Sequence, residues 1–108
     1  MAVNCTSLEQ VREHIDGLDR KIVSLIAERG AYVSQAAGFK KDSEAVKAPQ
    51  RVEQVIAKVR SLAQELGANA DITESVYRAM IAAFIQQELA EHSALQAADQ
   101  AGRTYRAK

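Results

Sequence analysis

Apolar residues recur along the first third of the chain at the spacing of one helical face. Between Ser7 and Lys40 the intervals are three and four residues, apart from one gap of seven; we call this series the first-helix stripe, and its members are Leu8, Val11, Ile15, Leu18, Ile22, Leu25, Tyr32, Ala36 and Phe39. Such intervals over more than four repeats are typical of a heptad pattern, in which helices pack along their length. Ser7 and Gln10 form an S-x-x-Q capping box. The pattern predicts a helix from about Ser7 to Lys40.

A second helix is predicted from Pro49 to just before Gly67. Proline favours the first turn of a helix and glycine favours the residue after its end. Between these two lies a helical stripe made of Val52, Val55, Ile56, Val59, Leu62, Ala63 and Leu66. The preceding segment, 41–48, is polar and lacks helical periodicity, so it predicts a flexible loop.

Asp71 and Glu74 mark the expected start of a third helix, which runs to about Leu95. Its apolar positions are Ile72, Val76, Tyr77, Met80, Ile81, Phe84, Ile85 and Leu89. The pattern therefore predicts an all-α, three-helix domain over residues 1–95 and a frayed tail over residues 96–108.

The first helix is too long for a monomeric domain of this size. A helix from Ser7 to Lys40 would measure ~50 Å at 1.5 Å per residue. A compact domain of 108 residues has a diameter of only ~35 Å. A monomer would leave part of the first-helix stripe uncovered, so the sequence predicts an intertwined, all-helical homodimer.

The composition excludes several classes of partner and site. Fourteen Lys and Arg balance fourteen Asp and Glu, which argues against nucleic acid as a partner because its binders need a basic surface. Cys5 is the single cysteine, so neither a disulfide framework nor a multi-cysteine metal site is expected. No apolar run reaches the roughly 18 residues of a membrane span, and the polar start does not resemble a signal peptide. We expect a cytoplasmic protein without cofactor or metal.

Two cations lie at unusual positions on the first helix. Arg29 fills the gap in the first-helix stripe, and Lys40 follows eleven residues later, which places it on almost the same helical face. A buried guanidinium needs an anion, so the pair could bind an anionic ligand. Alternatively, both side chains extend to water or pair with a glutamate from another helix.

Glu88 continues the apolar face of the third helix. Tyr77, Ile81, Phe84 and Glu88 are spaced by four, three and four residues. Burial there would favour the neutral acid, which donates a hydrogen bond; alternatively, the helix end has already reached solvent. His14 and His92 lie beside the first stripe and near a helix end, and a surface position is expected for both.

These residues suit electrostatic rather than covalent chemistry. The chain offers cations and one candidate neutral acid in an apolar helical interior, but no nucleophile beside a base at a recognisable spacing. This set suits a small dianionic substrate whose reaction requires positioning and charge stabilisation.

The ordered motifs resemble the all-helical chorismate mutase family, which includes isochorismate–pyruvate lyase. They are VREHIDGLDRKIVSLIAERGAYV, GFKK and APQRV, and the likeness covers about residues 5–95. It implies three helices per chain, an entwined dimer and two active sites between the subunits. By this resemblance Arg29 binds a substrate carboxylate, Lys40 donates to the ether oxygen and one carboxylate, Arg51 lies near the site, and Arg12 reaches the partner's site. Glu88 stands where many members have a glutamine that donates to the same oxygen.

Two residues depart from mutases of the enteric type. Val52 stands where these have a glutamate that binds the substrate hydroxyl, and Phe84 stands where they have serine. Both departures, and the segments NCTSLEQVRE and SEAVKAPQRV, are similar to isochorismate–pyruvate lyase. That lyase usually has glutamine at the position of Glu88, however, which favours the mutase.

The leading interpretation is a chorismate mutase, which converts chorismate to prephenate. The alternative on the same site is isochorismate–pyruvate lyase, which produces salicylate and pyruvate. A non-catalytic helical dimerisation module is the distant alternative, and it leaves Arg29 and Lys40 without a role.

Overall fold

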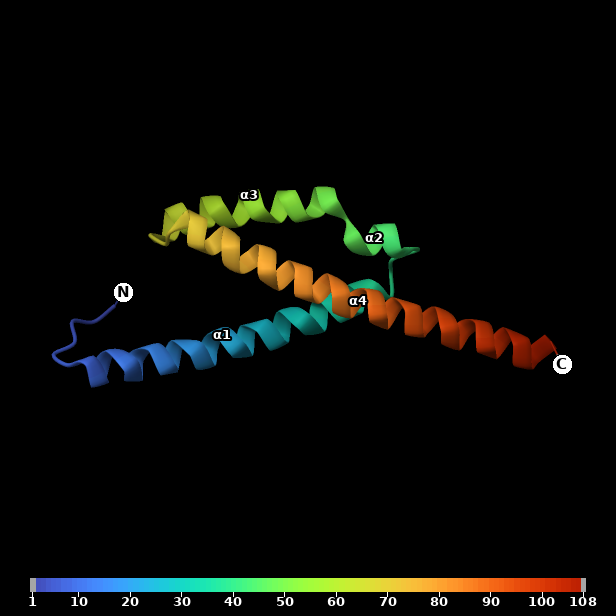
Figure 1. Ribbon diagram of the computed structural model, residues 1–108, viewed down its shortest axis with the longest axis horizontal. Helices are drawn as coiled ribbons and strands as arrows, with labels where there is room; N and C mark the ends of the chain where they lie inside the picture. The colour runs from blue at the N-terminus through green and yellow to red at the C-terminus, as the bar shows by residue number, and fades with distance from the viewer. Residues whose placement is uncertain (1, 108) are drawn as a thin grey trace. The chain divides into compact units, whose positions relative to one another are not determined.

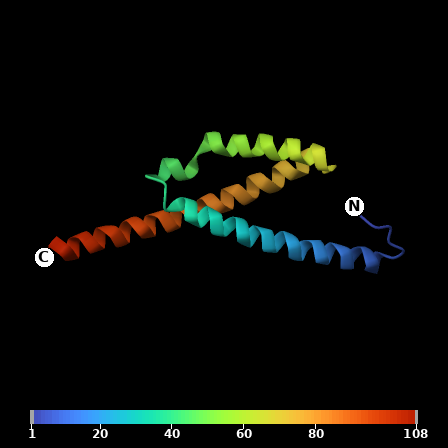
Figure 2. The same ribbon diagram turned by 180° about the vertical axis from the view of Figure 1, so that it is seen from behind.

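The computed structural model describes residues 2–107, which form four helices and no strand: α1 (Leu8–Ala37), α2 (Ser43–Lys47), α3 (Pro49–Leu66) and α4 (Ala70–Ala107) (Figure 1). The predicted all-α class is confirmed. The chain divides into two compact units, Met1–Tyr32 and Val33–Lys108, and the boundary falls within α1. Figure 2 shows the same helices from behind. Among the described helices, none has both the length and the apolar character that a membrane span requires.

The predicted capping box is present at the start of α1, with one difference. Ser7 Oγ accepts a hydrogen bond of 3.1 Å from the Gln10 backbone N–H. The Gln10 side chain reaches one residue further back than expected, since its Oε1 accepts from the backbone N–H of Thr6 at 2.9 Å. The first contact satisfies a donor that a helix start otherwise leaves unpaired, and the second holds the residue before the cap against the first turn.

The first-helix stripe is exposed on the single chain. Leu18 and Leu25 keep 56% and 61% of their surface accessible, and Leu8, Val11, Ile15 and Ile22 are exposed too. The unit Met1–Tyr32 therefore presents a row of large aliphatic side chains that the chain itself leaves uncovered.

The end of α1 and the segment after it differ from the prediction. Tight turns between Gly38 and Gln35 and between Phe39 and Ala36 end the helix, so that α1 stops at Ala37 rather than Lys40. The segment 41–48 is not a loop throughout, because Ser43–Lys47 form α2. Its cap is Asp42, whose Oδ1 accepts from the backbone N–H of Ala45 at 2.8 Å.

The start and end predicted for the second helix are confirmed by α3. Pro49 begins it, and Gly67 caps it in the left-handed conformation at φ 78°, which suits glycine. Ala48 separates α2 from α3 and is left-handed as well, with φ 38° and ψ 61°. A residue with a Cβ rarely takes this conformation.

The third predicted helix corresponds to α4, but its ends differ. Asn69 rather than Asp71 caps it, because Asn69 Oδ1 accepts from the backbone N–H of Ile72 at 3.0 Å. The helix continues past the expected end near Leu95 to Ala107. The division into a domain 1–95 and a tail 96–108 stays a prediction.

Helices α2 and α3 pack against α4. The apolar core of this unit contains Ala37, Val46, Ile56, Val59, Ala63 and Ile81. Its members come from all four helices, and α4 supplies the surface on which the shorter elements assemble.

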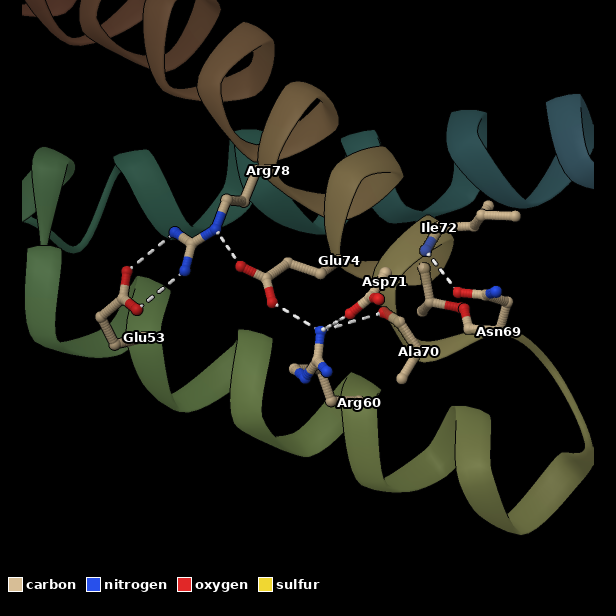
Figure 3. Close-up of polar contacts among 9 residues, drawn as sticks. Glu53, Arg60, Asn69, Ala70, Asp71, Ile72, Glu74 and Arg78 are labelled. Atoms are coloured by element: carbon tan, nitrogen blue, oxygen red, sulfur yellow. Dashed lines mark hydrogen bonds and ion pairs between the residues drawn. The ribbon is translucent and has the colours of Figure 1, made fainter.

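A chain of ion pairs joins α3 to α4 (Figure 3). Arg78 binds both carboxylate oxygens of Glu53, at 2.9 and 3.0 Å, and contacts Glu74 at 2.6 Å. Arg60 then binds Glu74 at 2.8 Å and Asp71 at 3.0 Å. Hydrogen bonding from Arg78 holds the pKa of Glu53 and of Glu74 below the ordinary value of 4.5.

Candidate active site

The structure brings two of the predicted site residues, Lys40 and Glu88, into direct contact. Lys40 lies between α1 and α2, and its Nζ is 2.6 Å from Oε2 of Glu88 on α4. The Glu88 side chain is 4% exposed and that of Lys40 is 27% exposed. Glu88 is therefore buried, and the alternative of a solvated helix end is wrong because α4 continues beyond it.

The contact places opposite charges together in a partly enclosed site. Removing a carboxylate from water is unfavourable unless a partner compensates, and the Lys40 ammonium is that partner. A hydrogen bond between two charged groups is short and strong. An ammonium carries three N–H donors and Glu88 takes one, so Lys40 retains capacity to bind a further acceptor.

His92 also contacts Lys40, although the sequence predicted a surface position for this histidine. It is 6% exposed, and its Nε2 lies 3.0 Å from the backbone carbonyl oxygen of Lys40. The sequence contained a signal for this burial, since His92 follows Glu88 by four residues and thus shares its helical face. His14, by contrast, is exposed as expected.

A second contact holds the same part of the chain on α4. Ser34, in the last turn of α1, donates a hydrogen bond of 3.1 Å to Glu91 Oε1. Gln87 donates to the same oxygen at 3.2 Å. Residues 87–92 of α4 therefore bind the segment 34–40 at three points: the Ser34 hydroxyl, the Lys40 ammonium and the Lys40 carbonyl.

The other predicted site residues lie on three helices. Arg51 and Val52 occupy the first turn of α3, where Arg51 is exposed and Val52 half-buried. Phe84 is half-buried on α4, one turn before Glu88. Arg12 and Arg29 lie on α1 in the unit Met1–Tyr32 and are thus outside the compact unit that contains Lys40 and Glu88. Arg12 is exposed and Arg29 half-buried.

A hollow in the surface lies apart from these residues. It is an open groove of about 940 Å³ between the N-terminal segment and α1, and none of the predicted site residues lines it. Val11, Ile15 and Leu18 form part of its wall. Because these are members of the first-helix stripe, we attribute the groove to that apolar surface and not to a substrate pocket.

The sequence matches known proteins over the region that carries these residues. Residues 11–89 match the family described as chorismate mutase type II, and this range includes every predicted site residue from Arg12 to Glu88. The chain is also 33% identical over 86 residues to an isochorismate pyruvate lyase of Pseudomonas aeruginosa. That alignment covers 80% of this chain and 85% of the relative.

Proposed function

We propose, on the premise that this chain belongs to the type II chorismate mutase family, that it catalyses the rearrangement of chorismate to prephenate. In this reaction the ether C–O bond breaks while a C–C bond forms between the ends of the two allyl units. No electron or proton has to enter or leave. The protein's task is to hold the reactive conformer and to stabilise charge in the transition state.

The contact between Lys40 and Glu88 is the observation that carries this proposal. Negative charge develops on the ether oxygen as the C–O bond breaks, and donors aimed at that oxygen lower the barrier. The Lys40 ammonium is one such donor. Glu88 Oε2 lies 2.6 Å from the Lys40 Nζ, so both side chains can contact the same substrate atom.

Glu88 contributes a second donor only when it is protonated. The neutral acid carries an O–H that can donate to the ether oxygen, whereas a carboxylate only accepts hydrogen bonds. Chorismate carries two carboxylates, and one of them can accept a hydrogen bond from the Lys40 ammonium beside Glu88.

The arginines would hold the substrate carboxylates. By family resemblance we assign one carboxylate to Arg29, place Arg51 beside the site, and assign Arg12 to the site of a partner subunit. Two fixed carboxylates keep the enolpyruvyl side chain folded over the ring. That restraint removes much of the entropic barrier to an intramolecular reaction.

We further propose that the protein is a homodimer. The first-helix stripe supports this, since Leu18 and Leu25 are more than half exposed on the single chain and aliphatic rows of this kind favour burial against another helix. A second copy supplies a matching row, and it would also bring its Arg12 to the site.

Isochorismate–pyruvate lyase activity is the second candidate. Val52 and Phe84 support it, because mutases of the enteric type have a glutamate and a serine at these positions. The similarity to the isochorismate pyruvate lyase of Pseudomonas aeruginosa supports it as well. In the lyase reaction the ether bond breaks while a ring hydrogen moves to the methylene carbon of the side chain, so that pyruvate leaves and salicylate remains. The same donors would stabilise the same oxygen.

Assays of the purified protein with chorismate and with isochorismate test both candidates. We expect the protein to convert chorismate to prephenate. If it instead converts isochorismate to salicylate and pyruvate with a higher kcat/KM than it shows for chorismate, it is the lyase. Lys40→Ala should abolish either reaction. Lys41→Ala is the matched control, since it removes the neighbouring, exposed lysine. A folded protein inactive on both substrates would contradict the proposal and favour a non-catalytic dimerisation module.

A further inference from the structure

Two residues of α4, Glu88 and His92, contact Lys40 at opposite ends. Glu88 binds the side-chain ammonium at 2.6 Å, and His92 Nε2 lies 3.0 Å from the backbone carbonyl oxygen. Both residues of α4 are buried. We propose that His92 is a positioning residue, which fixes the backbone of Lys40 so that the ammonium meets the substrate at a defined place. This inference rests on the proposed function of Lys40.

The backbone at Lys40 needs such an anchor. Lys40 follows the end of α1 at Ala37 and precedes the start of α2 at Ser43. Its N–H donates to the carbonyl of Ala37 at 3.3 Å, but its own carbonyl lies beyond the last helical turn and has no helical donor. His92 supplies a donor from a different helix, which ties this short connection to α4.

The geometry also fixes the protonation pattern of the ring. A carbonyl oxygen can only accept a hydrogen bond, so the facing nitrogen must carry a proton. The neutral His92 ring must therefore be the Nε2–H tautomer. A tautomer with the proton on Nδ1 would place two acceptors against each other, so the tautomer of His92 reports directly on this contact.

A fixed backbone matters because the lysine side chain is long and flexible. Glu88 restrains only the end of this side chain, through one hydrogen bond to the ammonium. The backbone contact with His92 uses no atom that the substrate needs, so it can persist through the reaction. Displacing a catalytic group by about 1 Å can lower the rate by on the order of a hundred-fold.

Two substitutions of His92 separate positioning from packing. His92→Phe keeps a ring of similar volume and removes the donor; we expect kcat to fall roughly ten- to hundred-fold with a smaller change in KM. His92→Gln places an amide N–H near the position of Nε2 and should retain most of the activity. Ser34→Ala is the matched control, because it removes another hydrogen bond between the segment 34–40 and α4 without touching Lys40.

Three results would overturn the proposal. These are a kcat within about two-fold of the native value for His92→Phe, equal impairment of the Gln and Phe variants, and an equal loss of kcat in Ser34→Ala. If His92→Phe does not fold, His92→Gln and Ser34→Ala still test the proposal. It then requires that His92→Gln retain most of the native kcat, and a large loss of kcat in this variant would overturn it.

Nitrogen NMR of the native protein gives a readout that does not depend on activity. The imidazole nitrogens of His92 should report the Nε2–H tautomer whenever the ring is neutral, and finding the Nδ1–H tautomer would refute the contact. If the protein were inactive on both substrates while this tautomer was present, the proposed function would have failed and the His92–Lys40 contact would stand.

Discussion

The ammonium of Lys40 lies 2.6 Å from the carboxylate of Glu88, although 48 residues separate the two in the chain. The contact joins the third residue after the end of α1 to the middle of α4. Only the folded unit creates it, and it brings a cation and a buried acid to one point.

Replacing Glu88 with glutamine should retain the activity. The glutamine amide has nearly the shape of the carboxylic acid and its N–H groups donate hydrogen bonds, so it can serve the ether oxygen from the same place. We therefore expect a kcat for Glu88→Gln no lower than the native value, and a loss on the order of a hundred-fold for Glu88→Leu, which has no donor. Glu91→Gln, three residues later on α4, is the control and should keep the native kcat. A native kcat for Glu88→Leu would show that Glu88 is not the donor.

Arg29→Ala and Arg12→Ala should each lower the activity on the order of a hundred-fold. A refolded mixture of the two variants should regain part of the activity. If one site takes Arg29 from one chain and Arg12 from the other, a hybrid dimer contains one intact site of two. Random pairing of equal amounts makes about half of the dimers hybrid, so refolding the mixture should recover about a quarter of the native activity. Arg20→Ala, an exposed arginine of α1, should be nearly silent. Without recovery, the two arginines do not share a site across chains.

The native protein should sediment as a dimer of twice its 11.8 kDa chain mass. Leu18→Lys introduces a charge into the first-helix stripe and should weaken association, because the ammonium would lose its hydration at the interface. Ser24→Lys adds the same charge to α1 outside the stripe and should leave the dimer intact. A folded monomer at micromolar native protein would argue against the homodimer.

Acid should weaken the ion pairs between α3 and α4. Folding lowers the pKa of Glu53 and Glu74 below the ordinary 4.5, so the folded protein binds fewer protons than the unfolded chain in this range. Their stabilising contribution is therefore present above pH 4.5 and lost as the pH falls through the folded pKa values. Urea denaturation from about pH 6 to about pH 3 should show a smaller loss of stability for Glu74→Gln than for the native protein.

Glu65→Gln is the control for this series, because Glu65 is an exposed residue of α3 outside the ion-pair chain. It should retain the native dependence of stability on pH. If Glu74→Gln loses stability as steeply as this control does, the pairs of Glu74 do not contribute to the acid response.

Ala48→Gly should stabilise the protein. The left-handed backbone at Ala48, with φ 38°, is unfavourable for a residue with a Cβ, and glycine relieves this at some cost in chain entropy. We expect the free energy of unfolding to rise by about 0.5–1 kcal/mol. Ala57→Gly, at an exposed position within α3, should lower it by about 1 kcal/mol. A loss of stability at both positions would contradict this account of Ala48.

The sequence predicted the long helices because their signals are local and repeated. Pro49 and Gly67 act through their own backbone preferences, and both mark the ends of α3 as expected. The five residues of α2 are too few to show a period, so only the cap at Asp42 could have revealed them. The turns that end α1 before Lys40 depend on Gly38 and Phe39, and the continuing apolar spacing concealed them.

The part of the candidate site that lies on a single helical face could be predicted from residue spacing. The spacing from Tyr77 to Glu88 suggested burial of Glu88, but it could not choose between burial and a solvated helix end, because this depends on what packs there. The pairing of Glu88 with Lys40 arises from tertiary contact. His92 was misassigned for a related reason: α4 was expected to end soon after it, and the helix instead continues to Ala107.

The position of Lys40 in the chain has a consequence for protein synthesis. A ribosome adds Lys40 before 48 further residues bring Glu88, and His92 follows four residues after that. At 5–20 residues per second, roughly two to ten seconds pass before the last of these partners has been made. During that time the lysine has neither of its α4 contacts. A nascent chain interrupted before Glu88 would thus carry Lys40 without either of the groups that hold it in the folded unit, so these contacts can form only after α4 has been made as far as His92.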